Sequence, residues 1–306
     1  MPHHATTPEG RHRRGTARCT RLLAAVATCA AALGLLPVLA ATPAAAAAAG
    51  IPGCTPETLA LTTPGTLTFG TQRPTLAPFF IANRPSSGKG FEGEIAYAIA
   101  AQLGFARSQV AWRSTPFADA IAPGAKDFDI DLNSISITPA RRRNVDFSRP
   151  YYASPKGVIV KRGSTYAGAT TLDALATARF GAQAETTNVA AARRIAAGPV
   201  TVYGTTEETL AAFNRGVIDA MIWDLPLTVR LVATSVPSGV VVGQFPTALG
   251  SDWGAVLEKG SPLTPCVNRA ISALLADGTI ERARERWMPF TEREPTLAFS
   301  AEAVTG

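Results

Sequence analysis

The stretch DIDLNSISITPARRRNVDFSRPYY, residues 129–152, contains the strongest signal for the fold and for a binding site. Its apolar start predicts a strand that ends in a polar loop, and the Thr-Pro pair that follows predicts a turn ahead of Arg141. A guanidinium donates two parallel hydrogen bonds to a carboxylate, and nearby hydroxyls and backbone N–H groups can complete its shell. The stretch therefore predicts a carboxylate site formed by Arg141 with Asn133, Ser134 and Ser136.

The rest of the chain alternates short apolar runs with helical patterns, which predicts an α/β fold. Thr205 and Glu208 form a capping-box pair, and Gly216 ends the helix that they open. Thr264 as N-cap, with Pro265 at the first helical position, predicts a later helix. The predicted strands are residues 67–70, 128–132, 158–160 and 217–222.

Six further blocks accompany the opening stretch in a fixed order. They are GTLTFGT (65–71) with Ala77-Pro78-Phe79, GFEGEIAYAIAAQLG (90–104), FADAIAPGAKDFDI (117–130), TTLDALATARFGAQAETTN (170–188), TEETLAAFNRGVIDAMIWD (206–224) and ADGTIERARERW (276–287). In this order they resemble the family 3 bacterial extracytoplasmic amino-acid-binding proteins, the solute-binding components of ABC importers. The resemblance covers roughly residues 65 to 290 and implies a two-lobe, type II periplasmic-binding-protein fold with a hinge of two crossing strands.

This resemblance also implies how the chain is divided. Lobe 1 is expected to be discontinuous, with lobe 2 inserted into it. The expected segments are a secretory signal peptide (1–49), an N-terminal arm (50–64), the first part of lobe 1 (65–154), lobe 2 (155–243), the second part of lobe 1 (244–290) and a C-terminal tail (291–306).

The N-terminus carries the pattern of a secretory signal peptide. Five arginines precede an Ala/Leu/Val run over residues 22–49 that ends in repeated A-x-A. The run is also long enough for a membrane anchor, but it is broken by two prolines. Removing the five arginines and Glu9 from 29 basic and 23 acidic residues leaves 24 and 22, a net charge of about +2. No basic patch then remains to favour a nucleic-acid partner.

Two cysteines, Cys54 and Cys266, remain after the leader. In an oxidising compartment an even pair predicts a disulfide. The alternative is a lipid anchor at Cys54, because residues 51–54 loosely resemble a lipobox. Either way, the protein is expected to be extracytoplasmic, secreted or held at the cell surface.

A zwitterionic ligand needs a site for its cation opposite the carboxylate site. The resemblance places Asp224 there, as the acceptor of the α-ammonium; the alternative is a helix N-cap ahead of Pro226. Thr186 and Thr187 lie where relatives carry a Gly-Thr-Thr loop that contacts the ligand carboxylate, although Thr187 could instead only cap the helix. Glu185 replaces the glycine of that loop.

The ligand's side chain is expected to lie against the loop after the first strand. Relatives that bind cationic amino acids carry an aspartate near Gln72 and an aromatic residue near Leu76. Neither Gln72 nor Leu76 can compensate a cation, so the resemblance disfavours a cationic amino acid, while Arg73 leaves an acidic one open. Phe117 resembles the aromatic wall of the pocket, or is a core residue.

The resulting hypothesis is a non-enzymatic, monomeric receptor that passes an amino acid to a membrane ABC permease. The alternative is an enzyme on the same scaffold, a cyclohexadienyl-dehydratase-like lyase with Glu185 as the proton donor. The three histidines all lie in the leader, so neither a metal site nor a cofactor is expected in the mature chain.

Overall fold

The structure is a computed structural model, and it describes residues 51–246, 252–290 and 293–300. The predicted signal peptide, residues 1–49, lies outside these residues. Within them, no helix has the length and apolar character that a membrane crossing requires.

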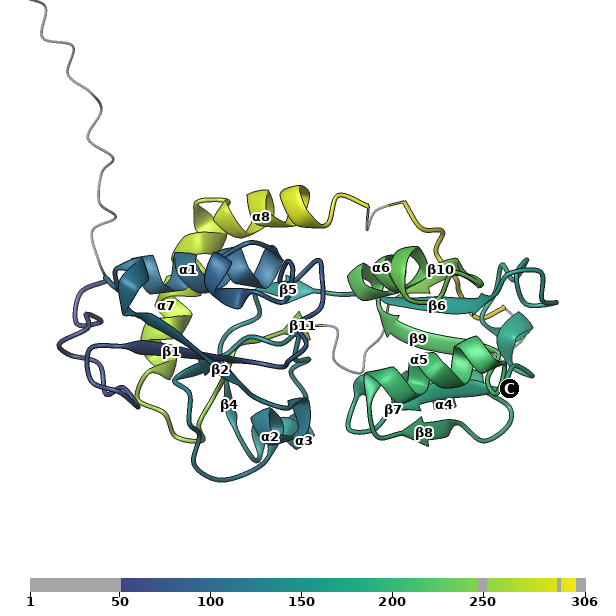
Figure 1. Cartoon of the computed structure of the whole chain (residues 1–306), viewed down its shortest axis with the longest axis horizontal. Coiled ribbons are helices and arrows are strands. Elements are labelled where there is room, and N and C mark those ends of the chain that lie inside the picture. Colours follow the sequence, from purple (N-terminus) through teal and green to yellow (C-terminus); the bar gives the residue numbers. More distant parts are fainter. Residues whose placement is uncertain (1–50, 247–251, 291–292, 301–306) are drawn as a thin grey trace, which may run out of the picture. The chain divides into compact units, whose positions relative to one another are not determined.

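The first lobe is built on a mixed five-stranded sheet in the order β2-β1-β3-β12-β4. Strands β1, β2 and β4 of this sheet are labelled in Figure 1. Strand β1 is parallel to β2 and β3, whereas β12 is antiparallel to β3 and β4. The strands are β1 (Leu67–Thr71), β2 (Val110–Ser114), β3 (Ile130–Asp131), β4 (Asp146–Phe147) and β12 (Val256–Leu257). The helices are α1 (Phe91–Gln102), α2 (Phe117–Ile121), α3 (Pro139–Arg142), α7 (Thr264–Ala276) and α8 (Thr279–Trp287), with short 3-10 turns at Pro85–Ser87 and Arg107–Gln109.

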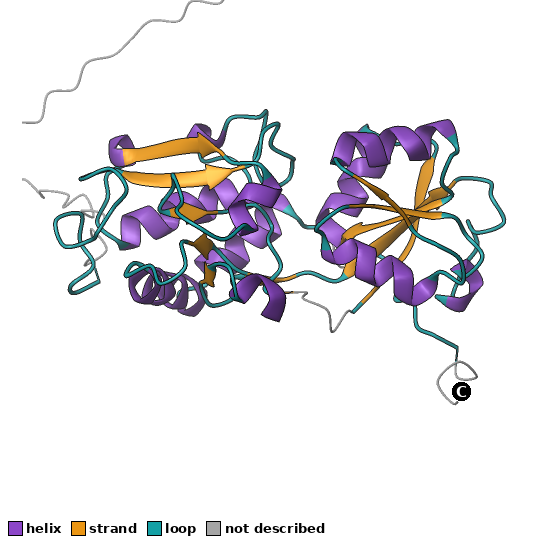
Figure 2. Cartoon of the chain, turned by 90° about the horizontal axis from the view of Figure 1, so that it is seen from below, coloured by secondary structure: helices purple, strands orange, loops and turns teal. Residues whose placement is uncertain are grey.

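The second lobe has its own five-stranded sheet in the order β10-β6-β9-β7-β8, with helices on both faces (Figure 2). Strand β6 is antiparallel to β9 and β10, and β7 is parallel to β8 and β9. The strands are β6 (Lys156–Lys161), β7 (Phe180–Gln183), β8 (Thr201–Tyr203), β9 (Ala220–Asp224) and β10 (Gly239–Phe245). The helices are α4 (Thr187–Ile195), α5 (Thr206–Arg215) and α6 (Leu225–Thr234), with a 3-10 turn at Asp173–Leu175.

A third, two-stranded sheet pairs β5 (Tyr152–Ala153) with β11 (Asp252–Trp253) in antiparallel fashion. These two segments lie where the chain leaves the first large sheet and where it returns to it. The sheets thus confirm an α/β fold of two lobes. The lobe boundaries remain a prediction; strand β10 continues to Phe245, two residues past the end expected for lobe 2.

Some of the local predictions are confirmed and others are wrong. Thr205 Oγ1 accepts from the Glu208 N–H, and the Glu208 carboxylate accepts from the Thr205 N–H, so the capping box is present. Gly216 ends α5 with a φ of 79°. Thr264, however, is the first helical residue of α7 and Leu263 is its N-cap. The strand expected from residue 217 begins only at Ala220, because the turn after α5 takes up the first residues.

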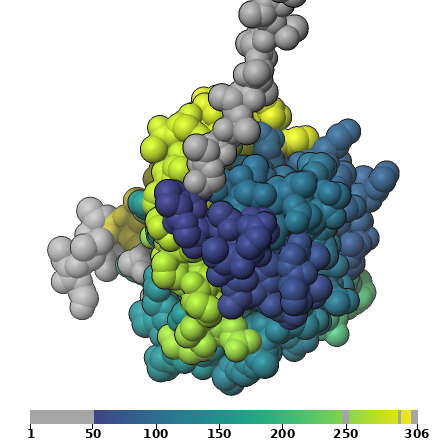
Figure 3. Space-filling model, turned by 90° about the vertical axis from the view of Figure 1, so that its left-hand side faces the viewer, coloured from purple at the N-terminus to yellow at the C-terminus, as the bar shows by residue number. Residues whose placement is uncertain are grey.

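The predicted disulfide is confirmed. Cys54 and Cys266 are bonded, with their Cα atoms 5.7 Å apart, and they are 212 positions apart in the sequence. Figure 3 shows the N-terminal arm in purple against the yellow-green C-terminal segment that contains α7. A sulfur in a disulfide cannot also carry a lipid thioether, so this pairing excludes the lipid-anchor alternative at Cys54 while the bond is formed.

The C-terminal segment is not a free tail in its described part. The Leu297 N–H donates to the Gln244 carbonyl on β10, and the Leu172 N–H donates to the Ala298 carbonyl. Leu297 is 2% exposed and belongs to the apolar core of the second lobe. Residues 293–300 therefore pack on the second lobe, although the helix before them, α8, belongs to the first.

Candidate ligand-binding site

All ten residues that the sequence predicts for ligand binding line a single pocket. The first lobe contributes Gln72, Leu76, Phe117, Asn133, Ser134, Ser136 and Arg141, and the second contributes Thr186, Thr187 and Asp224. They come from the loop after β1, the start of α2, the loop between β3 and α3, helix α3 itself, the N-cap and first residue of α4 and the end of β9. The fold thus brings together residues that are up to 152 positions apart in the sequence, counted from Gln72 to Asp224.

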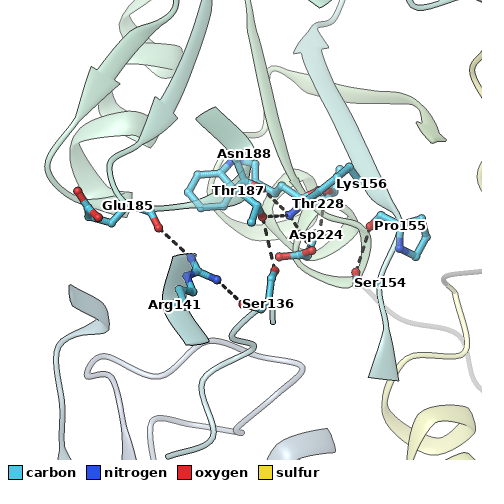
Figure 4. A network of polar contacts seen from close by, with 11 residues as sticks. Ser136, Arg141, Ser154, Pro155, Lys156, Glu185, Thr187, Asn188, Asp224 and Thr228 are labelled. Carbon is cyan, nitrogen blue, oxygen red and sulfur yellow. Dashed lines mark hydrogen bonds and ion pairs between the residues drawn. The ribbon is translucent and has the colours of Figure 1, made fainter. Parts of the chain in front are cut away.

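Arg141 lies on the short helix α3, whose start is capped by the Thr138 hydroxyl. The guanidinium is buried and donates to the carbonyls of Ser136, at 2.7 Å, and Glu185, at 2.8 Å (Figure 4). Its Cζ also lies 5.1 Å from the ring centroid of Phe117. A guanidinium has five N–H donors, so these two bonds leave donors for a ligand.

Burial lowers the pKa of Arg141 to about 10, against the opposing effect of the carboxylates of Asp224 and Glu185. Arg141 therefore stays a cation at neutral pH. A buried, permanently charged guanidinium held by two carbonyls is suited to bind a planar anion.

Asp224 is the N-cap residue of α6, but its side chain makes no capping bond. Its Oδ1 is instead 2.9 Å from Lys156 Nζ, in an ion pair between two neighbouring strands of the second sheet. Lys156 Nζ also donates to Thr187 Oγ1 and Asn188 Oδ1, both at 2.8 Å (Figure 4). The predicted ammonium acceptor thus already has a cation of the same lobe beside it.

Lys156 was missed by the sequence reasoning. The residue opens the strand KGVIVK and its side chain is 1% exposed. The sequence signal that could have indicated a buried lysine is its position at the start of an apolar run that is predicted to be a strand.

The loop before α4 places its three notable side chains differently. Thr187 Oγ1 faces Lys156, while Thr186 is the N-cap residue without a side-chain capping bond and donates to the Gln183 carbonyl. The alternative that Thr187 only caps the helix is therefore wrong. Glu185 adopts a left-handed backbone conformation with φ 60°. Its carbonyl points to Arg141, whereas its carboxylate is exposed, points away, and does not line the pocket (Figure 4).

Glu92 is a second residue that the sequence reasoning missed. It lines the pocket from α1 and is 1% exposed. Its carboxylate accepts bonds from the Tyr151 hydroxyl and from Ser134. Burial raises its pKa to about 7, and these hydrogen bonds only partly oppose that shift. The helical spacing of Glu92 with Ile95 and Ile99 was the available signal, since it puts an acid on the apolar face.

Two buried donors around the pocket have no partner among the described residues. They are the Asn133 side-chain amide and the Trp223 indole N–H, and both residues line the pocket. A buried donor without a partner is costly, so these groups favour a ligand that supplies acceptors. No cluster of ligating side chains suited to a metal ion occurs in the described part of the chain.

Two α/β lobes that contribute to one polar pocket define the class of two-lobed solute receptors. The chain belongs to the bacterial extracellular solute-binding proteins, family 3, whose profile matches residues 67–290. Its fold is the type II periplasmic-binding-protein fold. The relatives described next are named as binding proteins.

Three similar proteins illustrate the range of ligands. The L-cystine-binding protein TcyJ of Escherichia coli K12 is 28% identical over 226 residues, 73% of this chain and 82% of that protein. The ABC transporter arginine-binding protein 1 of the same strain is 26% identical over 221 residues, 70% and 88% of the two chains. The structure of an ancestral arginine-binding protein bound to arginine has a TM-score of 0.61 and 27% identity, and the match covers 73% of this chain and 98% of that one.

Proposed function

We propose that the protein captures an amino acid in the pocket around Arg141 and delivers it to a membrane ABC permease. The observation that carries the proposal is the convergence of the ten predicted residues on one pocket with a buried cation that has unused donors. A ligand carboxylate loses its hydration when the pocket encloses it, and hydrogen bonds from such a cation compensate for that loss. The proposed receptor is an extracytoplasmic monomer after cleavage of its signal peptide.

We further propose that the amino acid is not cationic. Gln72 and Leu76 line the pocket without offering a carboxylate or an aromatic face. Lys156 adds a positive charge directly behind Asp224. Arginine-binding relatives are similar to this chain overall, but a pocket lined by Arg141, with Lys156 directly behind Asp224, opposes a ligand with a positively charged side chain.

The dehydratase alternative depended on Glu185 as a proton donor inside the cleft. Its carboxylate is exposed and lies outside the lining of the pocket around Arg141, so the geometry of this pocket does not favour that alternative.

The test is a thermal-shift screen of residues 50–306 against the common amino acids, after unfolding and refolding to remove carried-over ligand. A ligand that binds only the folded state stabilises it by about 2.7 kcal/mol at a hundredfold excess over Kd. We expect one or a few non-cationic amino acids to raise the melting temperature. A response to arginine and lysine alone would contradict the proposed ligand class, and silence would contradict the proposed function.

A further inference from the structure

Lys156 fills a complete ammonium-binding site inside the protein. A lysine ammonium has three donors, and here Thr187 Oγ1, Asn188 Oδ1 and Asp224 Oδ1 accept all three at 2.8–2.9 Å. The side chain is 1% exposed, and Lys156 itself does not line the pocket. The cation therefore contacts Asp224 from outside the pocket, while Asp224 itself lines the pocket.

This ion pair changes the charge that a ligand meets. Asp224 alone would attract the α-ammonium of an amino acid, but Lys156 neutralises it and would repel a second ammonium close by. Arg141 then remains as a cation of the pocket whose side-chain hydrogen bonds go to the Ser136 and Glu185 carbonyls and not to a carboxylate. The other lining acid, Glu92, is bonded to Tyr151 and Ser134 and holds its proton below about pH 7.

The unpartnered donors of the pocket also favour an anionic ligand. The Asn133 amide and the Trp223 indole N–H add two donors to the unused donors of Arg141. Since an unmatched buried donor is costly, the pocket favours a ligand with more acceptors than donors. A net anion fits this description better than a neutral zwitterion.

We propose that Lys156 is a specificity-determining residue, and that the ligand carries a net charge of −1. Acidic amino acids and monocarboxylates that lack an α-ammonium both carry this net charge. The inference rests on the proposed receptor function; it specifies the net charge of the ligand and admits carboxylates other than amino acids.

Calorimetric titrations with matched pairs test the inference, at about pH 6 so that Glu92 is largely protonated. The first pair compares L-glutamate, the anion, with neutral L-glutamine, which differ in side-chain charge. The second pair compares 4-methyl-2-oxopentanoate, an anion without an ammonium group, with neutral L-leucine. We expect the anion to bind at least about tenfold more tightly in one of the pairs, which also identifies its source. Equal or tighter binding of the neutral member in both pairs overturns the inference alone. Silence from all four compounds and from the amino-acid screen overturns the proposed function and the inference together.

Variants at Lys156 test whether this residue causes the preference for the anion. Lys156→Met leaves Asp224 uncompensated, so the preference for the anion should fall by at least about tenfold. The double variant Lys156→Met with Asp224→Asn keeps the net charge of the pocket, so it should keep the preference. Lys161→Met, on the same strand and outside the pocket, is the control. Circular dichroism shows whether Lys156→Met is folded. If it is folded and its preference for the anion is unchanged, the role of Lys156 is rejected. If it does not fold, loss of the preference in the folded double variant rejects that role instead.

Discussion

The guanidinium of Arg141 in the first lobe donates through Nη2 to the carbonyl of Glu185 in the second lobe, at 2.8 Å. One side chain thus contacts backbone of both lobes, because its Nη1 bonds the Ser136 carbonyl. A ligand carboxylate beside this group would meet a cation that is already fixed in orientation.

Arg141→Ala should therefore abolish binding and preserve the fold. Removing one partner of a buried charge pair costs about 2 kcal/mol or more, which weakens binding at least about thirtyfold. Calorimetry with the ligand found in the screen measures the loss, and the circular dichroism spectrum checks the fold. Arg143→Ala, exposed two residues further on, is the matched control. Retained affinity in folded Arg141→Ala would reject the assignment of the carboxylate site.

Glu185→Gln should change ligand affinity by less than about threefold. The residue reaches Arg141 through its backbone carbonyl, which the substitution keeps, and its carboxylate is exposed outside the pocket. Surface substitutions of this kind stay within about 0.5 kcal/mol. If the variant instead abolished the conversion of a cyclohexadienyl acid by the wild-type protein, the dehydratase alternative would be restored.

Glu92 should make stability depend on pH. Its pKa is raised from 4.5 to about 7 in the folded chain, mainly by burial, with Tyr151, Asp131 and Asp224 close enough to interact. The folded chain then holds a proton that the unfolded chain has lost, so this group lowers the free energy of unfolding as pH rises from about 4.5 to 7.

Glu92→Gln removes that dependence while keeping an oxygen for Tyr151 and Ser134. The difference in unfolding free energy between the wild type and Glu92→Gln should shift by up to about 3 kcal/mol in favour of the variant between about pH 5 and pH 8. Urea unfolding of both proteins at the two pH values measures it. An identical difference at both values would mean that Glu92 titrates normally.

Replacing Cys54 and Cys266 together with alanine should lower stability without changing ligand affinity. The bond closes a span of 212 positions, for which chain entropy gives an upper value of roughly 5 kcal/mol, and it lies outside the pocket. Urea unfolding with and without a reducing agent measures the effect. The reducing agent should destabilise only the wild type; equal sensitivity in the variant would contradict this account.

Leu297→Ala should destabilise the second lobe by about 2 to 5 kcal/mol, because it empties a buried site that belongs to the same apolar cluster as Val242 and Phe245. Thermal unfolding monitored by circular dichroism checks the loss. Thr296→Ala, its exposed neighbour, is the control and should change stability by less than about 0.5 kcal/mol. A neutral result for Leu297→Ala would mean that the C-terminal segment does not contribute to the fold.

Much of the fold followed from local chemistry. The capping box of Thr205 and Glu208 and the left-handed Gly216 depend on neighbours three to eleven residues apart, so a single sequence contains the whole signal. The boundary of β9 was wrong, because an apolar run does not show which of its residues a turn will take.

The α/β class, the pairing of two cysteines and ten of the residues that line the pocket around Arg141 were predictable from the sequence. The charge of the pocket was not, because it depends on contacts between distant strands. Lys156 and Asp224 are 68 positions apart and meet as direct cross-strand partners, because β6 and β9 pair in one particular register. Strand register depends on how the whole sheet assembles, and a shift by one residue would turn either side chain to the opposite face. No local pattern in the sequence therefore reveals that Asp224, the predicted ammonium acceptor, is already paired with a cation.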